Sequence, residues 1–349
     1  MSYKSPLICL KSSLLAISLL LLQPVIAQYN FQELDQEWQT RQKLLGKDAV
    51  ILLSSKDTLI YKKEVGDFNA KTVAPIASCS KWLTAALVMQ FVDEGKLSLD
   101  DKVAKWLPEF EKYGKNYITI RLCLCHETGI ADEASFLKKM LGRKKFASLE
   151  EEVNSFASTD IRTNPGTDFW YGSIGLNIAG RVLEIISKKK FDVLIKQKLF
   201  NVIGMRKTSF TTLDASAINP SGGAMSTADD YMKFLVMLLN KGKANGKQVL
   251  SEESVERLKE IQTKSVKISY APKAAEGFGY ALGSWVVGEK EGKATSLACP
   301  GLFGTWPMID FCRGYAYLVF VKNLLGEERA EAHLALKKAI DGQMTSTCK

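Results

Sequence analysis

"APIASCSKWLTAALV", residues 74–88, places a serine three positions before a lysine at the start of a predicted helix. Residues three apart on a helix share one face, so Ser78 and Lys81 project together. The amide groups and the dipole of the first helical turn favour negative charge that develops there. The same Ser-x-x-Lys spacing recurs at Ser135–Lys138 and Ser187–Lys190. The spacing by itself therefore leaves an ordinary amphipathic helix equally open.

A serine hydroxyl becomes a useful nucleophile only when a base lies beside it. The chain has two histidines, His126 in the loop-like stretch "LCLCHETGIAD" and His333 in the closing helix. A Ser-His-Asp triad is possible only through His126, and no Gly-x-Ser-x-Gly elbow supports it. Lys81 is the better candidate base, provided that the apolar residues after it desolvate the amine.

A second candidate lies in "NPGTDFWYGSIGLNIAGRVLE", residues 164–184, where Tyr171 stands between a Pro-Gly turn and a helix. A tyrosine at such a junction can direct its hydroxyl into a cleft. We expect a neighbouring lysine to lower the pKa of Tyr171 by stabilising the phenolate. A tyrosine and a lysine that share a proton form a general base without histidine. The alternative is a half-buried core tyrosine.

Strand patterns near both chain ends and helix patterns between them define the predicted fold. We predict an α+β protein, an α/β sandwich whose antiparallel sheet is built from both chain ends and flanked by helices, with an inserted mostly helical region. Residues 28–349 form a single domain in this prediction, with the sheet in 28–95 and 216–349 and mainly helices in 96–215. Strands are expected within 49–65, around a Lys56-Asp57 turn, and within 278–323. Helices are expected within 31–44, 78–94, 98–110, 148–158, 173–190, 226–242, 252–262 and 327–340.

The first 30 residues, "MSYKSPLICLKSSLLAISLLLLQPVIAQYN", carry two lysines, an apolar run and small residues up to Ala27. This pattern is typical of a secretory signal peptide at residues 1–27, so we expect an exported protein, periplasmic or secreted. The alternative is an uncleaved membrane anchor, although the run is short for a membrane span. No later stretch is long and apolar enough to span a bilayer. No membrane span is therefore expected after cleavage.

The composition argues against nucleic-acid, metal and cofactor binding. The net charge is +9, but the lysines are scattered and form no stripe interleaved with aromatic residues. Cys123 and Cys125 are one residue apart, and no cysteine lies in a metal-ligand cluster. We predict no metal, no cofactor and no nucleic-acid partner, and the sequence leaves the oligomeric state open.

Four blocks carry a resemblance to a known family: "IASCSKWLTAALVMQFVDEGKLSLDDKVAKWLPEF", "ITIRLCLCHETGIAD", "PGTDFWYGSIGLNIAGRVLE" and "PSGGAMSTADDYMKFLVMLLNKG". In this order they resemble motifs of the serine β-lactamase-like, penicillin-binding family, in particular its class C β-lactamase and family VIII esterase branch. The resemblance implies that Ser78 is the acylated nucleophile. It implies that Lys81 and Tyr171 share the base role, with Tyr171 protonating the leaving group. It also implies that Ser173 orients Lys81 or the substrate and that His126 is structural.

The family's third motif, Lys-Thr-Gly or His-x-Gly, corresponds here to "LACPGLFGTWPMIDF", residues 297–311. Cys299 stands where the resemblance leads us to expect a cation, while Gly301 keeps the glycine that lets a substrate approach the backbone. The N–H groups of Leu302 and Ser78 are the expected oxyanion hole. Cys299 is expected to be a buried thiol or to pair with Cys312.

A thiol offers little to a substrate carboxylate, so this departure favours an ester or an amide over β-lactams and D-Ala-D-Ala peptides. We predict an exported serine hydrolase that forms an acyl-enzyme on Ser78 and cleaves a small-molecule ester, amide or short peptide. The alternative is a catalytically weak member of the same family that binds the cell envelope or peptidoglycan.

Overall fold

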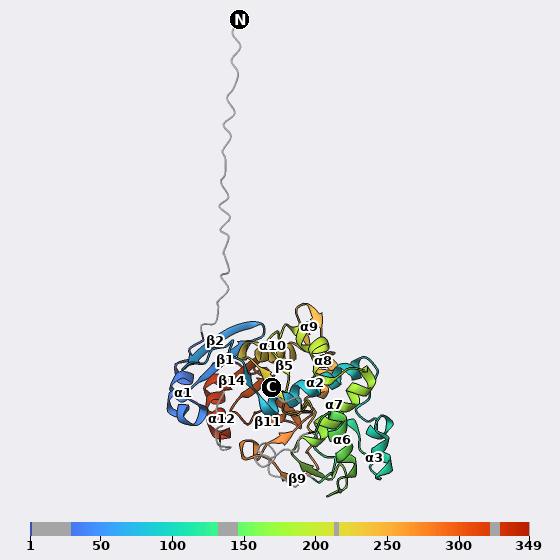
Figure 1. Ribbon diagram of the computed structural model, residues 1–349. Coiled ribbons are helices and arrows are strands. Elements are labelled where there is room, and N and C mark those ends of the chain that lie inside the picture. The colour runs from blue at the N-terminus through green and yellow to red at the C-terminus, as the bar shows by residue number, and fades with distance from the viewer. Residues whose placement is uncertain (2–28, 132–145, 213–215, 322–328, 349) are drawn as a thin grey trace.

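The computed structural model describes residues 29–131, 146–212, 216–321 and 329–348, besides Met1. The predicted signal peptide therefore lies outside the described residues except for Met1, and so does the Ser135–Lys138 pair. At the centre is an antiparallel sheet of seven strands in the order β10-β11-β12-β13-β14-β1-β2 (Figure 1). The strands are β1 (Ala49–Ser55), β2 (Thr58–Val65), β10 (Gly279–Tyr280), β11 (Trp285–Lys290), β12 (Lys293–Ala298), β13 (Trp306–Asp310) and β14 (Tyr315–Val321).

The two ends of the chain meet within this sheet. β1 pairs with β2 on one side and with β14 on the other, so that Ala49 lies opposite Val321. The β1–β2 hairpin turns at Lys56-Asp57, where Lys56 has a positive φ of 51°, as tight hairpin turns require. The predicted antiparallel sheet from both chain ends is confirmed.

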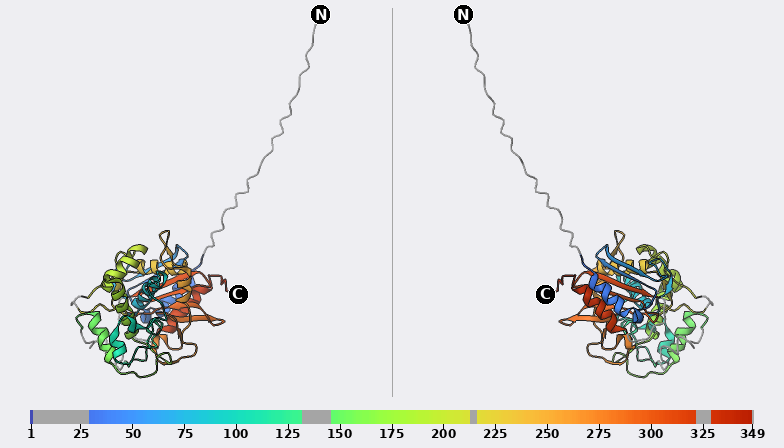
Figure 2. Two further views of the ribbon diagram at one scale, coloured as in Figure 1. Left: turned by 90° about the vertical axis from the view of Figure 1, so that its right-hand side faces the viewer. Right: turned by 90° about the vertical axis from the view of Figure 1, so that its left-hand side faces the viewer.

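Side chains of β1 alternate between two apolar layers. Ile51 packs on the side covered by α1 (Gln32–Leu45) and α12 (Ala330–Asp341), whereas Val50 and Leu52 pack on the opposite side. Figure 2 shows α1 and α12 side by side against the sheet. Because both faces of the sheet are covered, β1 is apolar along most of its length instead of alternating with polar residues.

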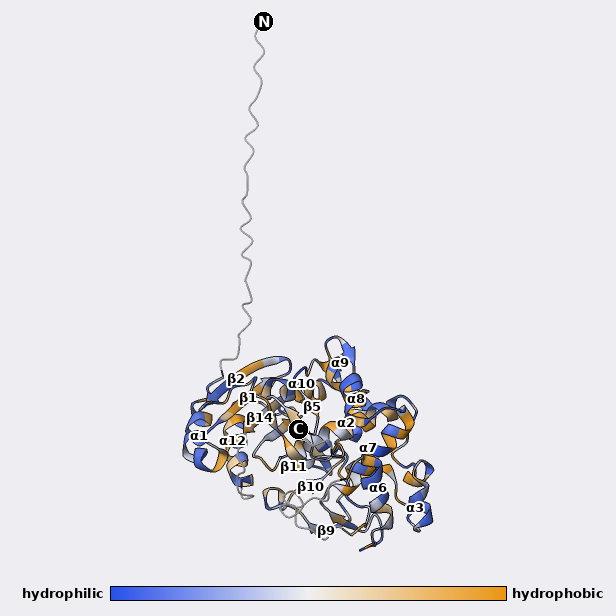
Figure 3. Cartoon of the chain, viewed as in Figure 1, coloured by the Kyte–Doolittle hydropathy of each residue, from blue (hydrophilic) through white to orange (hydrophobic). Residues whose placement is uncertain are grey.

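Helices cover the opposite face of the sheet. α10 (Ala228–Leu239) packs on β1, β13 and β14, and α2 (Ser80–Asp93) packs against α7 (Ile174–Ser187). In Figure 3 the apolar residues of these elements gather inside the molecule and the polar residues of the outer helices lie outside. The other elements are β3 (Ala74–Pro75), η1 (Ala77–Cys79), η2 (Val103–Lys105), α3 (Pro108–Lys112), α4 (Ile120–Leu124), α6 (Leu149–Ser158), β4 (Asp168–Trp170), α8 (Phe191–Ile195), η3 (Lys196–Phe200), α9 (Asn201–Ile203), β5 (Ser209–Phe210), β6 (Ala224–Ser226), β7 (Lys243–Ala244), β8 (Lys247–Gln248), α11 (Glu252–Arg257), β9 (Lys267–Tyr270) and η4 (Lys273–Ala275).

Several predicted helices are shorter than their patterns, and two of them differ most in proportion to their length. Residues 98–110 contain η2 and the start of α3, because Pro108 lacks the N–H that a helix interior needs and instead begins α3. The helix expected over 252–262 ends at Arg257. In the part of the chain that the structure describes, no helix combines the length and the apolar character needed to cross a membrane.

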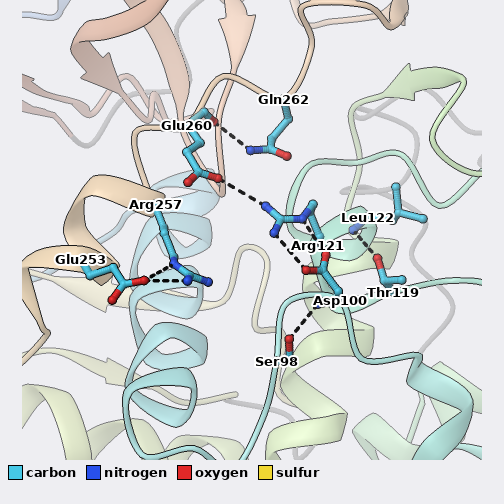
Figure 4. Close-up of polar contacts among 9 residues, drawn as sticks. All are labelled: Ser98, Asp100, Thr119, Arg121, Leu122, Glu253, Arg257, Glu260 and Gln262. Carbon is cyan, nitrogen blue, oxygen red and sulfur yellow. Dashed lines mark hydrogen bonds and ion pairs between the residues drawn. The ribbon is translucent and has the colours of Figure 1, made fainter.

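An ion-pair cluster fixes α4, the short helix that leads to His126. Arg121 lies between Asp100 and Glu260 and donates hydrogen bonds to both carboxylates (Figure 4). Thr119 caps the helix by accepting a hydrogen bond from the N–H of Leu122. The loop that contains His126 is thus held in place by residues that are distant from it in sequence.

Cys312 and Cys348 form a disulfide that joins the C-terminal residues to the β13–β14 turn. The pairing of Cys299 with Cys312, one of the two alternatives for Cys299, is therefore wrong. Cys299 is a buried free thiol, as the other alternative expected. The β13–β14 turn lies at a sheet end, where it meets the C-terminal tail, whereas Cys299 points into the core.

Candidate active site

Ser78 lies in η1, the 3₁₀ turn immediately before α2. Ala77 has φ of 44°, in the left-handed region that a residue with a Cβ rarely adopts. Such strain persists only where the surrounding structure fixes the backbone, and here the Tyr231 hydroxyl donates to the carbonyl of Cys79 at 2.8 Å. Ser78 is 4% exposed, and this exposed part faces a pocket.

Lys81 lies one helical turn after Ser78 and is 2% exposed. Its Nζ donates to Ser78 Oγ at 3.1 Å and to the carbonyl oxygen of Ser221 at 2.9 Å. Ser221 is held in turn, because its N–H donates to Asn177 Oδ1 of α7 at 3.0 Å. The structure therefore brings together the serine and the lysine that the sequence paired. Sequence reasoning named neither Ser221 nor Asn177, although Ser221 lies in the quoted "PSGGAMSTADD" block.

Tyr171 follows β4 and lies over the same pair. Tyr171, Ser78 and Trp285 line the same pocket, and Lys81 Nζ is 4.8 Å from the centre of the Tyr171 ring. We expected a neighbouring lysine to lower the pKa of Tyr171, and this expectation is wrong. Burial raises the pKa of Tyr171 well above its usual value, because a buried phenolate loses its hydration. The group is a phenol at neutral pH.

An aromatic cluster supports Tyr171 from behind. The His126 ring is centred 4.7 Å from the Tyr171 ring, and its Nε2 lies 3.1 Å from the hydroxyl oxygen of Tyr280. Burial, and next the charge of Lys81, lowers the pKa of His126 well below its usual value, so the imidazole is neutral. The side chain that donates to Ser78 Oγ is thus that of a lysine, and His126 contacts the aromatic residues beside it.

The third-motif segment is a turn that follows β12. A Cβ at Gly301 would lie 2.3 Å from the carbonyl oxygen of Ile76, so only glycine fits against the segment that carries Ser78. Cys299 is 1% exposed, and burial raises its pKa to about 12. It lies behind the pocket wall and carries no charge. Among the described residues, the Leu302 N–H donates none of the backbone hydrogen bonds of the loops and turns.

Ser78, Tyr171 and Gly301 border a small pocket that opens to solvent. Its wall is mostly apolar and includes Trp285, Trp306 and Leu302. Arg329, which precedes α12 and is 6% exposed, adds a cation to the lining. Sequence reasoning missed Arg329 because 251 positions separate it from Ser78 in the chain. Ser173, predicted to bind substrate, is the residue before α7 and is partly exposed, but it does not border this pocket.

The profile of the β-lactamase family matches residues 40–340, so this chain belongs to that family of serine hydrolases. Protein Rv1367c of Mycobacterium tuberculosis is 26% identical over 330 residues, which cover 75% of this chain and 82% of that protein. Esterase EstB of Burkholderia gladioli is 25% identical over 201 residues, or 52% of this chain and 50% of EstB. A solved structure from Bacteroides dorei, assigned as a β-lactamase, has a TM-score of 0.79 and 26% identity, covering 90% of this chain and 98% of its own.

Proposed function

We propose that this protein is a serine hydrolase that forms an acyl-enzyme on Ser78 and cleaves a small ester, amide or short peptide. The observation that carries the proposal is the 3.1 Å hydrogen bond between Lys81 Nζ and Ser78 Oγ at the edge of an apolar pocket. At the other described Ser-x-x-Lys pair, the Ser187 hydroxyl donates to the backbone of Glu184 at the end of α7. Ser187 thus donates to a backbone carbonyl oxygen and does not border the pocket.

Lys81 and Tyr171 divide the proton transfers between them. In its neutral form Lys81 accepts the proton of Ser78 as Oγ attacks the substrate carbonyl. Tyr171 remains protonated because burial raises its pKa, so it donates to the leaving group and recovers a proton from Lys81. The proton lost by Ser78 thus leaves with the first product. Water then cleaves the acyl-enzyme, returning one proton to Ser78 Oγ and releasing the acid.

The N–H groups of Ser78 and Leu302 are the proposed donors to the oxyanion. Two fixed amide donors can stabilise the charge that develops on the substrate oxygen during attack. Both residues border the pocket, and Gly301 packs closely against Ile76 where their two segments meet. The mostly apolar wall of the pocket supports a small apolar acyl group as the part of the substrate that binds there.

Arg329 favours a second candidate function, hydrolysis of a substrate that bears a carboxylate. The thiol of Cys299 argues against such substrates, but Arg329 places a guanidinium in the same lining from another element. An arginine can hold a carboxylate through two parallel hydrogen bonds. If Arg329 does so, penicillin G should inhibit turnover of p-nitrophenyl butyrate more strongly than its methyl ester, and Arg329→Gln should remove the difference. Equal inhibition in the unmodified protein would exclude this candidate.

We also propose that the protein is exported after removal of residues 1–27. The leader pattern supports this, and so does the Cys312–Cys348 disulfide, since disulfides persist mainly in oxidising compartments. N-terminal sequencing of the protein recovered from its native cells tests the proposal. A start near Gln28 is the expected result, and a start at Met1 in the membrane fraction would overturn it.

Turnover of p-nitrophenyl butyrate by the purified protein tests the hydrolase proposal. We expect release of p-nitrophenol that Ser78→Ala abolishes and that Ser187→Ala, at the other described Ser-x-x-Lys pair, leaves unchanged. Loss of activity in both variants would point to unfolding or a different nucleophile. If the unmodified protein turns over neither this ester nor a β-lactam, the alternative of a binding protein for the cell envelope takes its place.

A further inference from the structure

Cys299 is a buried neutral thiol for which the proposed chemistry has no use. It is 1% exposed and lies behind the wall of the pocket, so it does not reach a bound substrate. It has no disulfide partner. A residue of this kind can still act on a reaction through the groups that it holds.

Cys299 contacts the turn that carries Ser78. Its Sγ lies 3.2 Å from the carbonyl oxygen of Ser78 and 3.4 Å from that of Gly283, so these two acceptors share its single proton. The thiol therefore contacts η1, the turn that carries Ser78, directly before the first turn of α2, which carries Lys81.

Two further contacts hold the turn after β12 against the segment that carries Ser78. Cys79 Sγ donates toward the carbonyl oxygen of Thr305 at 3.7 Å. Gly301 fits so closely that a Cβ there would lie 3.0 Å from Cys79 Sγ. Each thiol thus joins the segment that carries Ser78 to the segment that carries Leu302. Cys79 reaches from the Ser78 segment to Thr305, and Cys299 reaches from the other segment to Ser78.

We propose that Cys299 is a positioning residue, whose thiol fixes η1, the turn that carries Ser78, against the turn after β12 and so holds Ser78 and the two amide donors in their reactive arrangement. The inference rests on the proposed function, because it assigns Cys299 a role through Ser78. Thiols are weak hydrogen-bond donors, so the effect of each bond is modest. It arises from alignment of the reacting groups, and removal of the thiol should slow the chemical step more than it weakens substrate binding.

Kinetics of three variants test this role, with Cys123→Ala as the matched control because Cys123 is another fully buried free thiol, on α4. For p-nitrophenyl butyrate, Cys299→Ala should lower kcat about fivefold to tenfold, with KM within about twofold of the unmodified value. Cys299→Ser keeps a donor and should recover most of the lost kcat. Cys123→Ala should lower thermal stability without changing kcat. Equal losses of kcat in the two alanine variants, or no rescue by serine, would overturn the proposal.

Hydrogen exchange gives a readout that does not depend on turnover. In Cys299→Ala the amides of residues 76–84 should exchange faster than in the unmodified protein, whereas Cys123→Ala should leave them unchanged. If the unmodified protein shows no hydrolysis, the proposed function fails, but this comparison still decides whether Cys299 holds the turn. Unchanged exchange at residues 76–84 in Cys299→Ala would contradict the positioning role.

Discussion

Replacing Lys81 with methionine should remove catalysis and leave the fold intact. Methionine is unbranched and flexible, so it can occupy the space of the lysine chain without overpacking. A positioned general base contributes about 10²-fold to 10⁴-fold to a rate, so we expect kcat to fall by at least about 10²-fold. Substrate binding in the apolar pocket should change little, because Lys81 is not among the residues that border it.

The expected change in the free energy of unfolding is small. The loss of two hydrogen bonds lowers stability, whereas removal of a buried amine raises it. Lys81 is 2% exposed and donates to Ser78 Oγ and the Ser221 carbonyl. A hydrogen bond from a neutral donor contributes about 0.5–1.5 kcal/mol, so the loss of the two bonds costs about 1–3 kcal/mol. Methionine also avoids the cost of burying a polar amine. The free energy of unfolding should therefore change by about 2 kcal/mol or less, and Tm by a few degrees.

The assay combines turnover of p-nitrophenyl butyrate with thermal unfolding. Lys190→Met, at the exposed lysine of the other described Ser-x-x-Lys pair, is the control and should change neither. A Lys81→Met protein with the turnover of the unmodified enzyme would refute the base role. A Lys81→Met protein that no longer folds would show that the lysine is needed for the structure, and the separation of catalysis from stability would be refuted.

Three other changes test the surroundings of the site. Gly301→Ala should lower both kcat and Tm, since its Cβ would lie 2.3 Å from the Ile76 carbonyl oxygen; full activity would contradict the packing described here. Cys312→Ser removes the disulfide to Cys348 and should destabilise the protein by about 2–4 kcal/mol, a difference that must vanish when both proteins are reduced. Burial raises the pKa of Glu127 from 4.5 to about 7, so the folded state holds a proton that the unfolded chain has released, and stability should fall as pH rises from about 4.5 to 7. Glu127→Gln should flatten this slope in melts at several pH values, and an unchanged slope would assign it to other groups.

The parts of the site that the sequence predicted are local. Ser78 and Lys81 are one helical turn apart, so helix geometry alone places both side chains on one face. The junction at Tyr171 likewise follows from a turn and a helix that adjoin in sequence. The two-ended sheet was predicted because strand patterns gather near both ends of the chain, and β1 does pair with β14.

The parts that sequence reasoning missed depend on contacts between distant segments. The carbonyl of Ser221 that receives Lys81 is 140 positions away, and Arg329 enters the pocket from the start of the last helix. The spacing of residues along the sequence does not show that these distant segments lie close together. The pKa of Tyr171 was predicted in the wrong direction because charge can be counted in a sequence, whereas burial, the larger effect here, depends on the complete fold.

The acyl-enzyme on Ser78 is the claim on which the whole account depends, and trapping it is the most direct test. The purified protein is mixed with p-nitrophenyl butyrate, quenched in acid and analysed by intact mass and peptide mapping, beside Ser78→Ala. The account predicts a mass increase of one butyryl group, located on the peptide that contains Ser78 and absent from the variant. An adduct on another residue, or hydrolysis with the same adduct in Ser78→Ala, would contradict it.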